Sequence, residues 1–521
     1  MPNAPDRIRI LCDLKPALDG YAGIPQETRL LFRGLRSLAT CEVEGLIQHG
    51  GRQLRAPPPP TNKPLPLSRR IHRSSRVVVS LPQAGGTDLN EVATTRDAPA
   101  GGNTAKKSFL WQLAGLFPVT ALQFRALLGM PVRIGLFEQG LFEDFIWRTF
   151  FSKTLRPADK GLITSAPFHV LRPSRKRLHQ VGLAGRKYST TPRYLEIDTR
   201  GFDVLLAQTP FPGRVSAGTQ LVVRYHDMVP VLMPHTISDS AFHQASHFFA
   251  LQENVRAGAW FSCVSEATRQ DLLKVFPEAE PRTMVIHNIA SDEYFVEAAP
   301  PEMVLQILRN RQIKVPGIAS SRETALSLGL SSAGSLDYLL IVSTIEPRKN
   351  HLMLIAAWER LKYTSMPHLK LVVVGNLGWG FRPVLDAFRP WAERGDLIHL
   401  AAVPSAELRV LYRHAAATIC PSLAEGFDYS GIEAMRCGGI VLSSDIPVHR
   451  EVFDSASVYF DPYSAEDAAR VIGEVLAPDG LPIRDRLHAE GPKISGRYTA
   501  NHILPQWNQF LDDLRQRQAA Q

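Results

Sequence analysis

Two glutamates, Glu425 and Glu433, stand eight positions apart in a stretch that could bind a charged ligand. The apolar run Ala415–Cys420 before them predicts a strand, and Ile432–Cys437 predicts the start of a helix. One carboxylate therefore lies in a strand-to-helix loop and the other in the first helical turn. Such a loop presents free backbone N–H groups, which favour an anion. A carboxylate beside an anion site must serve another purpose, such as binding the hydroxyls of a sugar or a ribose.

A second interpretation of the same residues needs no ligand. Ser430 and Glu433 have the spacing of a capping box, in which two side chains satisfy free N–H groups at a helix start. The residues alone leave the ligand site and the cap equally open.

Two adjacent cations, Arg348 and Lys349, follow a predicted strand at Asp337–Ser343 and precede a predicted helix at Asn350–Lys362. Cations at such a position can neutralise a diphosphate leaving group. An exposed Arg-Lys pair is also common on protein surfaces, so this pair too has an ordinary interpretation.

His226 comes directly after another predicted strand, Leu221–Tyr225. Folds of the α/β class place ligand-contacting groups at this end of a strand. A lone histidine is more often structural, and the sequence pattern by itself does not separate the two roles.

These candidate residues lie along an alternation of short apolar runs and helix-length segments. Parallel, doubly wound sheets produce this alternation, so we expect an α/β fold. At 521 residues, with 45% hydrophobic and 21% charged residues, the chain can form two folded domains. The predicted strands are Ile8–Asp13, Val204–Gln208, Leu221–Tyr225, Trp260–Val264, Thr283–His287, Asp337–Ser343, Lys370–Val374, Leu397–Leu400, Ala417–Cys420, Gly439–Ser443 and Val458–Tyr459.

Changes in composition divide the chain into four predicted parts. They are a first Rossmann-like domain at 1–300 with an insertion at about 51–200, an interdomain connection at 301–335, a second Rossmann-like domain at 336–480, and a helical segment at 481–521 that crosses back to the first domain.

The predicted insertion begins with a basic stretch. Gly51–Arg76 contains seven Lys/Arg and no acidic residue, and Thr87–Thr104 is polar and glycine-rich, so we expect residues 51–105 to be flexible. Two segments dense in aromatic residues follow, Phe109–Phe117 and Phe142–Phe151. They could be core helices or, with the basic stretch, a surface that lies on an anionic bilayer.

The composition limits the possible partners and compartment. A net charge of +9 suits nucleic acid, an anionic membrane surface or a phosphorylated substrate, but no nucleic-acid-binding motif accompanies it. Five cysteines without paired spacing predict buried free thiols in a reducing compartment, and no Cys/His cluster has zinc-site spacing. Because the sequence shows no signal-peptide pattern and no apolar run of about 18 residues, we expect a cytoplasmic protein.

Four motifs carry a resemblance to a known family. Pro421–Met435 resembles the Glu-x7-Glu signature of retaining, nucleotide-sugar-dependent glycosyltransferases of family four, which have the GT-B fold. Ser444–Val452 resembles the family's "SDIP-x-HREV" run, and Ser343–Asn350 resembles its "G-T-x-E-P-R-K-N" phosphate-binding loop. His226–Pro230 resembles its "HD-x-x-P" loop. The similarity is specific over about residues 200–470, faint over 1–50 and absent over 50–200.

The resemblance implies a set of site residues. The positions that match catalytic residues of the family are His226, Arg348, Lys349 and Glu425. The positions that match its donor-binding residues are Glu433, Phe427, Asp428, Tyr429, Ser430, Gly431 and Val403. The positions in the cleft loop near donor and acceptor are Gly20, Tyr21 and Gly23.

The family also implies a role for each group. Arg348, Lys349 and backbone N–H groups near Ser430 would offset the charge of the diphosphate. Glu425 would hold the donor sugar, Glu433 the ribose hydroxyls, and His226 the far side of the sugar. The loop that contains Val403 would contact the nucleobase through backbone groups, which leaves the base, uracil or guanine, unassigned.

One position departs from the family pattern. Asp428-Tyr429-Ser430-Gly431 stands where the family usually has Gly-Leu-Pro or a similar apolar triplet. Asp428 could bind sugar hydroxyls and alter donor choice, or it could mark lost activity. Because both glutamates and the Arg-Lys pair are intact, altered specificity is favoured.

The resemblance therefore implies an α/β, GT-B fold and an enzyme that moves a hexosyl group with retention of configuration. The first domain would bind a saccharide or lipid-linked acceptor, and the second a nucleotide sugar. The motifs look most like bacterial mannosyltransferases of surface-polysaccharide assembly, so GDP-mannose is favoured over UDP- and dTDP-sugars. No Asp-x-Asp is present, so no divalent metal or other cofactor is expected.

Two other functions are compatible with these motifs. One is a catalytically silent scaffold that binds sugar nucleotide or glycan, and the other is a nucleotide-sugar epimerase with the same fold. If the enzyme acts on a lipid-linked acceptor, it would lie peripherally on the inner face of the plasma membrane. No nucleic-acid partner is expected.

Overall fold

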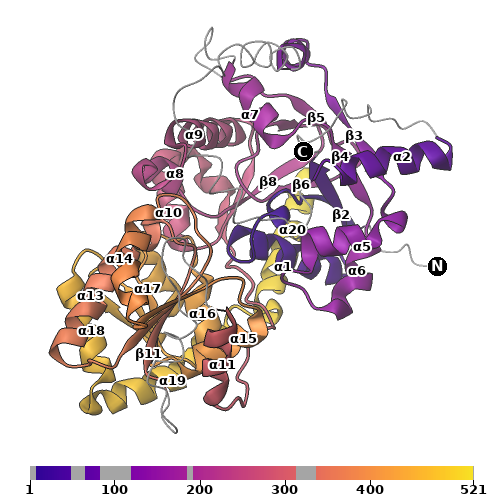
Figure 1. The fold of residues 1–521 in the computed structure, drawn as a ribbon. Helices are drawn as coiled ribbons and strands as arrows, with labels where there is room; N and C mark the ends of the chain where they lie inside the picture. The colour runs from indigo at the N-terminus through magenta and orange to yellow at the C-terminus, as the bar shows by residue number, and fades with distance from the viewer. Residues whose placement is uncertain (1–6, 49–64, 82–118, 185–191, 312–335, 520–521) are drawn as a thin grey trace, which may run out of the picture.

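The structure is a computed structural model that describes residues 7–48, 65–81, 119–184, 192–311 and 336–519. The chain forms two α/β domains, each built on its own sheet (Figure 1). The first domain contains the N-terminal half of the chain, and the second contains most of the C-terminal half. In the described residues, no helix is both long and apolar enough to cross a bilayer.

The first domain contains a ten-stranded sheet in the order β10-β9-β8-β6-β1-β2-β4-β3-β5-β7. Its paired strands are parallel except for β3 and β4, which are antiparallel. The strands are β1 (Ile8–Asp13), β2 (Cys41–Gln48), β3 (Val132–Phe137), β4 (Phe168–Leu171), β5 (Glu196–Asp198), β6 (Val204–Ala207), β7 (Arg214–Val215), β8 (Gln220–Tyr225), β9 (Trp260–Cys263) and β10 (Thr283–Val285).

The second domain contains a six-stranded, fully parallel sheet in the order β13-β12-β11-β14-β15-β16. Alternate side chains of β12 enter two cores: Val372 and Val374 pack on one face, and Leu371 and Val373 on the other. This two-sided burial is why the strands are short runs of mostly apolar residues. The strands are β11 (Tyr338–Val342), β12 (Lys370–Val374), β13 (Leu397–Leu400), β14 (Ala417–Cys420), β15 (Val441–Ser444) and β16 (Ser457–Phe460).

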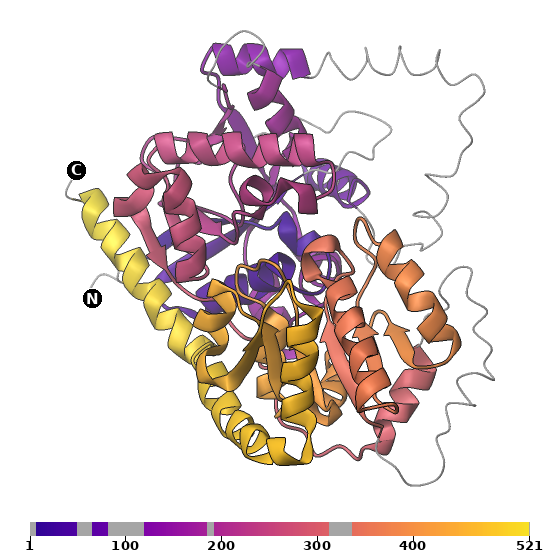
Figure 2. The same cartoon turned by 90° about the vertical axis from the view of Figure 1, so that its left-hand side faces the viewer.

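Helices cover both sheets (Figures 1 and 2). In the first part of the chain they are α1 (Ile24–Ser37), α2 (Leu67–Val78), α5 (Glu143–Ile146), α6 (Lys160–Thr164), α7 (Arg175–Ala184), α8 (Val229–Leu232), α9 (Ser240–Arg256) and α10 (Glu266–Val275). In the rest they are α11 (Glu302–Arg311), α13 (His351–Thr364), α14 (Arg382–Glu393), α15 (Ser405–His414), α16 (Tyr429–Arg436), α17 (Pro447–Phe453), α18 (Ala465–Leu476), α19 (Leu481–Gly496) and α20 (Ala500–Ala519).

The last helix, α20, lies along the first domain although α19 belongs to the second (Figure 2, yellow). Trp507 is completely buried in the core that β1 and α1 also form, and Phe510 lies 6.0 Å from the ring of Trp260. At the crossing, the N–H of Ala290 donates to the carbonyl of Tyr498 at 2.7 Å. Two chain segments far apart in sequence therefore pass between the domains side by side.

The region between the domains differs from the expected connection at 301–335. Its first part is α11, whose Val304, Ile307 and Leu308 are buried in the core of the second domain. The spacing of these three side chains places them on one helical face. This explains why α11 packs against the second domain rather than forming an extended connection between the domains. Residues 312–335 lie outside the described part.

The predicted insertion contains more structure than its composition suggested. Helix α2 falls inside the stretch expected to be flexible, and Ser74 accepts the N–H of Glu138 at 3.0 Å, which fixes α2 to the end of β3. The antiparallel β3 and the strands β2, β4, β5 and β7 were not predicted. Residues 51–64 and 82–105 lie outside the described part.

The two aromatic segments have different outcomes. In Phe142–Phe151, Trp147, Phe150 and Phe151 are buried in the first core, so the interpretation of this segment as a bilayer-facing surface is wrong. Their close spacing allows one short helical segment to fill the core beside α1. The segment Phe109–Phe117 lies outside the described residues.

Candidate active site

The candidate residues come from loops that follow parallel strands in both domains and face one interdomain cleft. His226 follows β8 of the first domain, while Arg348 and Glu425 follow β11 and β14 of the second. The domains touch at Gly426, where a Cβ would lie 1.9 Å from the carbonyl oxygen of His226. Only glycine allows this approach, which brings the loop of Glu425 next to His226.

A compact ion-paired cluster occupies the second-domain side of the cleft. Glu425 accepts from Arg348 Nη1 at 2.7 Å through one oxygen, and its other oxygen contacts Lys349 Nζ. Arg348 also donates to Glu346 at 3.0 Å and to the carbonyl of Ala424 at 2.8 Å. The two predicted cations and one predicted carboxylate are therefore direct neighbours.

Electrostatics keep this cluster charged. Burial favours the neutral form of Glu425, but the charges of Arg348 and Lys349 outweigh it and lower the pKa of the carboxyl. Burial likewise opposes the charge of the two cations, and Glu425 outweighs it and raises the pKa of each. The cluster thus holds two cations and one anion, with Glu346 beside them.

The backbone around the cluster is held rigidly. Asn350, in the left-handed region at φ 57°, donates from Nδ2 to the carbonyls of Pro421 and Pro462 at 3.1 and 2.8 Å. The N–H of Leu423 donates to the carbonyl of Arg348 at 2.9 Å. The short helical turn Pro347–Lys349 and the loop before Glu425 are therefore fixed to each other.

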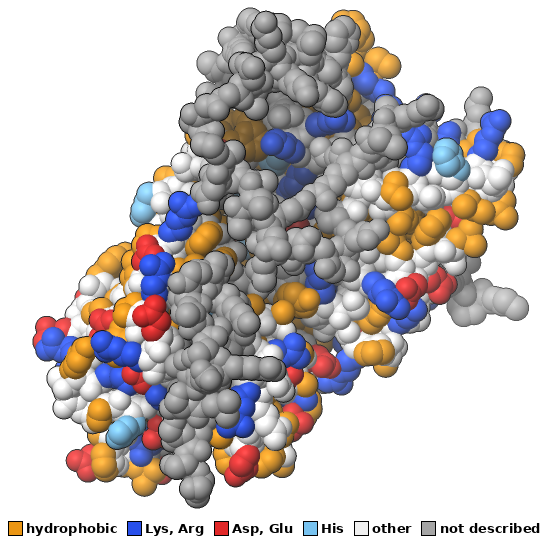
Figure 3. Space-filling model, in the orientation of Figure 1, with side chains coloured by type: hydrophobic (Ala, Val, Ile, Leu, Met, Phe, Trp, Pro, Cys, Tyr) orange, Lys and Arg blue, Asp and Glu red, His pale blue; other side chains and the backbone are white. Residues whose placement is uncertain are grey.

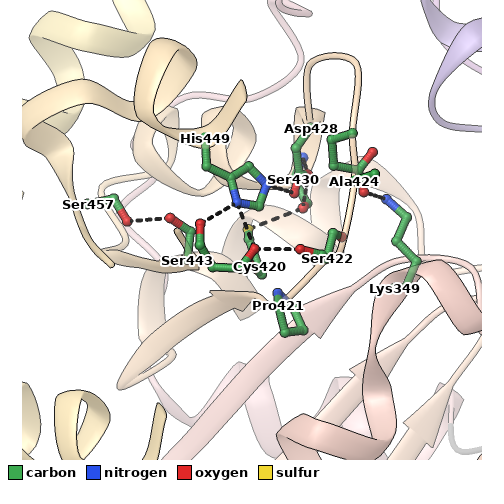
Figure 4. Close-up of polar contacts among 12 residues, drawn as sticks. Lys349, Cys420, Pro421, Ser422, Ala424, Asp428, Ser430, Ser443, His449 and Ser457 are labelled. Atoms are coloured by element: carbon green, nitrogen blue, oxygen red, sulfur yellow. Dashed lines mark hydrogen bonds and ion pairs between the residues drawn. The ribbon is translucent and has the colours of Figure 1, made fainter. Parts of the chain in front are cut away.

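Asp428 caps helix α16 (Figure 4). Its Oδ1 accepts the N–H and the hydroxyl of Ser430 at 3.1 and 2.6 Å, and its Oδ2 lies 3.2 Å from Nε2 of His449. Burial would raise the pKa of Asp428, but His449 and the charge of Lys349 hold it well below its ordinary value. Asp428 is thus an ionised cap, with φ 58°.

This arrangement corrects two expectations. The capping box of Ser430 and Glu433 is not formed, because the cap is Asp428 and Glu433 points elsewhere. The N–H of Ser430, expected to face the diphosphate, already bonds to Asp428. The carboxylate of Asp428 is likewise committed to Ser430 and to His449, which is itself completely buried and 3.1 Å from the hydroxyl of Ser444.

Glu433 faces the first domain from inside α16. Gln26 of α1 donates to its Oε1 at 3.0 Å, and the hydroxyl of Tyr412 donates to its Oε2 at 3.1 Å. Burial raises the pKa of Glu433 to about 7, and these hydrogen bonds offset only part of the effect. A second bridge lies beside it, where Tyr429 donates to Glu27 of α1 at 2.6 Å. Gln26 therefore occupies one side of the carboxylate expected to hold a ribose.

A cavity of about 320 Å³ opens on the first-domain side of the cleft. His226 lines it, and its Nε2 is buried without a hydrogen-bond partner. Burial, with the charge of Arg224, lowers the pKa of His226 well below its ordinary value, so the imidazole is neutral. Arg348 and Trp379 line the same cavity from the second domain. A ligand there would contact both domains.

Residues 330–493 match the family model described as "Glycosyl transferases group 1". The chain contains a group 1 glycosyl transferase domain. This domain holds Arg348, Lys349, Glu425 and Glu433, and it coincides with the six-stranded sheet and its helices.

The relatives of this domain include bacterial mannosyltransferases. The chain is 25% identical over 304 residues to the serotype-specific mannosyltransferase WbdA of Escherichia coli, which covers 57% of this chain and 34% of that protein. It is 25% identical over 230 residues to the O-antigen chain mannosyltransferase B of Escherichia coli. This match covers 44% of this chain and 55% of that protein. The chain thus matches between about a third and a half of these relatives' length.

The fold has a full-length counterpart among solved structures. The sucrose-phosphate synthase of Thermosynechococcus elongatus aligns with 99% of this chain and 100% of its own, with a TM-score of 0.56 and 14% identity. The two facing Rossmann-like domains, the second of them a group 1 domain, are the GT-B fold expected from the motifs.

The other predicted donor-site residues of the group 1 domain are mostly buried. Phe427 packs in the core, 5.0 Å from the ring of Tyr498, and Gly431 leaves no room for a Cβ, which would lie 2.3 Å from the ring of Phe453. Val403 is half-buried in the loop after β13. Phe427 and Gly431 therefore help to fix the loop before α16 and the start of that helix.

The predicted cleft loop lies directly before α1. Gly20 and Gly23 have φ of 47° and 71°, and Gly23 precedes the first residue of α1. Tyr21 is 56% exposed, with the ammonium of Lys153 5.4 Å from its ring centroid. Because Gln26 lies one turn further on, this loop is close to the interdomain contact with Glu433.

Sequence reasoning missed several residues of this site. Gln26 and Glu27 bridge the domains, and Trp379 donates from its indole to the carbonyl of Thr236 at 2.6 Å across the cleft. Their partners are more than 140 positions away, and no local pattern could have indicated them. Within the described residues, no group of three or more His, Cys, Asp or Glu side chains has the geometry of a metal site.

Proposed function

We propose that the protein is a retaining glycosyltransferase that moves a mannosyl group from GDP-mannose to a saccharide or lipid-linked saccharide in surface-polysaccharide synthesis. The observation that carries the proposal is the cluster of Arg348, Lys349 and Glu425, whose Arg348 lines the same cavity as the unpartnered imidazole of His226. The mannosyltransferase relatives support the choice of sugar.

The cluster would reorganise when the donor binds. The diphosphate would take over Arg348 and Lys349, whose positive field stabilises charge that develops on the leaving oxygen. Glu425 would then turn one or both oxygens to the sugar hydroxyls. His226 would satisfy its free Nε2 on the far side of the sugar, because a buried polar atom without a partner is costly.

The reaction itself would need no protein nucleophile. The bond between the anomeric carbon and the diphosphate oxygen breaks, and the acceptor hydroxyl oxygen bonds to the same face of that carbon. The hydroxyl proton passes to the departing phosphate oxygen. Two fixed cations would supply the charge stabilisation that a divalent metal supplies elsewhere.

The test is a comparison of nucleotide sugars with the full chain. A ligand that binds only the folded protein raises its melting temperature, so GDP-mannose should raise Tm more than UDP-glucose or dTDP-rhamnose. Transfer to a mannoside acceptor should then give an α-linked product from the α-linked donor. A rise with UDP-glucose alone would refute the GDP-mannose assignment, and an inverted linkage would refute retention.

A silent nucleotide-sugar binder is the second candidate. It is favoured by the ionised Asp428, which fills an N–H site at the start of α16 that a phosphate could use. Release of GDP from GDP-mannose only when acceptor is present distinguishes the transferase from this scaffold. An epimerase would instead change the nucleotide sugar without any acceptor.

The proposal also includes docking on an anionic membrane through α2. This helix carries Arg69, Arg70, Arg73 and Arg76 and no acidic residue, and its Leu67 and Ile71 are exposed. Leu136 and Leu141, also exposed, lie in and just after β3, to which α2 is fixed. Figure 3 shows basic and hydrophobic side chains together on this arm of the first domain. Each basic residue near such a surface contributes about 1 kcal/mol.

Co-sedimentation with vesicles tests the docking. Binding should require phosphatidylglycerol, weaken at high salt, and fall sharply in the variant Arg69→Ala/Arg73→Ala. Arg389→Ala/Arg394→Ala on and just after α14 is the matched control for charge. Binding that ignores lipid charge and salt would contradict the proposal.

A further inference from the structure

The cavity beside His226 is lined by more imidazole and guanidinium groups than one transferred sugar would use. His179 and Arg175 of α7 face it on one side, and His247 of α9 lies beside them. Asp227 is the single acidic side chain among the described residues that line it. Its Oδ1 already accepts the N–H of Val229 at 3.1 Å.

Two of the lining imidazoles have buried nitrogens that no described group satisfies. They are Nε2 of His226 and Nδ1 of His179. Buried polar atoms in folded proteins are almost always paired, so two unpaired nitrogens in one cavity indicate a polar ligand. His226 is assigned above to the transferred sugar. His179 lies in α7 and is not needed to bind the transferred sugar.

The electrostatics of the cavity indicate the sign of that ligand. Burial and the charges of Arg175, His247 and His243 lower the pKa of His179 to about 3. Burial, His243 and Arg175 likewise lower the pKa of His247 to about 3. The positive charge of Arg175 and of each imidazole disfavours protonation of the other imidazoles. An anion bound among them would be attracted by this charge and would favour protonation of His179 and His247.

The remaining groups around these imidazoles do not supply that anion. Arg175 is paired with Asp13 at 2.8 Å, and Arg348 is paired with Glu425 and Glu346. Burial raises the pKa of Asp227, which weakens its charge. The hydroxyl of Tyr225 contacts Nε2 of His247 at 3.2 Å and brings no charge, because burial raises its pKa well above the ordinary value.

We propose that this cavity binds an anionic group of the acceptor, a phosphate or a carboxylate, between His179, His247 and Arg175. The inference rests on the proposed transferase function, and it names an acidic or phosphorylated saccharide as the acceptor class. Trp379 closes the cavity from the second domain through its hydrogen bond to Thr236. The anionic group would therefore lie in the cavity that His226 and Arg348 also line, close to the proposed point of transfer.

Inorganic phosphate is the first probe, because it tests the cavity without an acceptor. The donor site also binds phosphate, so the experiment uses the full chain carrying Lys349→Ala, and compares it with Lys349→Ala/His179→Ala. Titration calorimetry should show phosphate binding in the first protein and about tenfold weaker binding in the second. His235→Ala, an exposed histidine that does not line the cavity, should leave binding unchanged.

Proton uptake distinguishes an anion site from a merely structural role of His179. Phosphate itself exchanges a proton in this pH range, so the two proteins are compared. Binding at pH 7 should take up more protons in Lys349→Ala than in Lys349→Ala/His179→Ala, measured as a heat that depends on the ionisation enthalpy of the buffer. Phosphate binding that needs Lys349 but not His179, or no phosphate binding at all, would overturn the proposal. Equal proton uptake by the two proteins would also overturn it.

Acceptor assays identify the source of the anion and separate this inference from the transferase proposal. With parent enzyme, mannose 6-phosphate and glucuronic acid are compared with methyl mannoside, and His179→Ala should raise KM for the preferred anionic acceptor more than it lowers kcat. A neutral acceptor preferred by parent and variant alike would overturn the inference while leaving the transferase intact. If the parent enzyme does not bind GDP-mannose, the proposed donor site is refuted instead. The phosphate titration would still show whether the cavity binds an anion.

Discussion

Replacing Glu433 with glutamine should make the folded protein more stable at alkaline pH. The carboxyl is only 4% exposed and accepts hydrogen bonds from Gln26 and Tyr412. Burial raises its pKa from the ordinary 4.5 to about 7. The folded state therefore binds this proton more tightly than the unfolded state, and the carboxylate destabilises the fold once it ionises.

The size of the effect follows from the pKa values. Each tenfold change in the acid constant is worth about 1.4 kcal/mol, so the penalty reaches about 3 kcal/mol. It is absent below about pH 4.5, develops between about pH 4.5 and 7, and is complete above that range. Glutamine carries no charge. Its amide oxygen can accept from Gln26 and its NH2 group can donate to the hydroxyl oxygen of Tyr412, so Glu433→Gln should lack this loss of stability.

Urea unfolding of parent and variant at several pH values between about 5 and 8 measures the effect. The difference in unfolding free energy should be small at the acid end and grow to about 3 kcal/mol in favour of the variant at the alkaline end. Glu278→Gln, at an exposed position, controls for loss of one negative charge. Parallel pH profiles for Glu433→Gln and the parent would refute the assignment of a buried, perturbed carboxyl.

The same variant tests the proposed ribose contact. A carboxylate accepts two hydroxyl donors, whereas the amide of glutamine accepts through one oxygen only. Donor affinity should fall by about 1–2 kcal/mol in Glu433→Gln even though the protein is more stable. Equal donor affinity in parent and variant, measured by calorimetry, would refute the proposed contact between Glu433 and the ribose.

Three further predictions concern the cleft. Lys349→Met should lower kcat by about 100-fold or more, because it removes charge stabilisation of the leaving diphosphate. Adding Glu425→Gln to this variant should recover stability but not turnover. A recovered kcat in steady-state assays of the double variant would contradict the proposed role of Lys349. EDTA should leave the parent's turnover unchanged, whereas a complete loss restored by Mg²⁺ would refute metal-free stabilisation of the diphosphate. Gly426→Ala should abolish transfer, because its Cβ would lie 1.9 Å from the carbonyl of His226; Gly140→Ala, where a Cβ meets open space, should leave transfer unchanged in the same assay.

The sequence predicted the second sheet well because its strands are buried on both faces. Strands such as β12 and β14 are mostly apolar runs, and such runs stand out from the surrounding helices. By contrast, β3 has exposed and half-buried positions, and β7 is only two residues long. Neither leaves a periodic pattern strong enough to detect, which is why these two strands of the first sheet were missed.

The candidate site was predictable where a residue follows a strand and not where its partner lies far away. His226, Arg348 and Glu425 all follow buried strands. His226 and Arg348 line one cavity, and Glu425 is paired with Arg348. The helix cap at Asp428 was missed. Ser430 and Glu433 have the spacing of a capping box two positions later, whereas the helix is capped by Asp428, which has φ 58°. The contact of Gln26 with Glu433 spans 407 positions, and no local pattern encodes it.

The return of α20 to the first domain has a mechanical consequence for the cleft. The chain passes between the domains twice, and the two passages are joined where Ala290 bonds to Tyr498. Paired crossings of this kind act as a hinge, which restricts the domains to rotation about one axis. The hydrogen bond from Trp379 to the carbonyl of Thr236 is a further link between the domains, at the cavity that Trp379 lines. A rotation that opens the cavity to substrate would therefore have to break the hydrogen bond of Trp379.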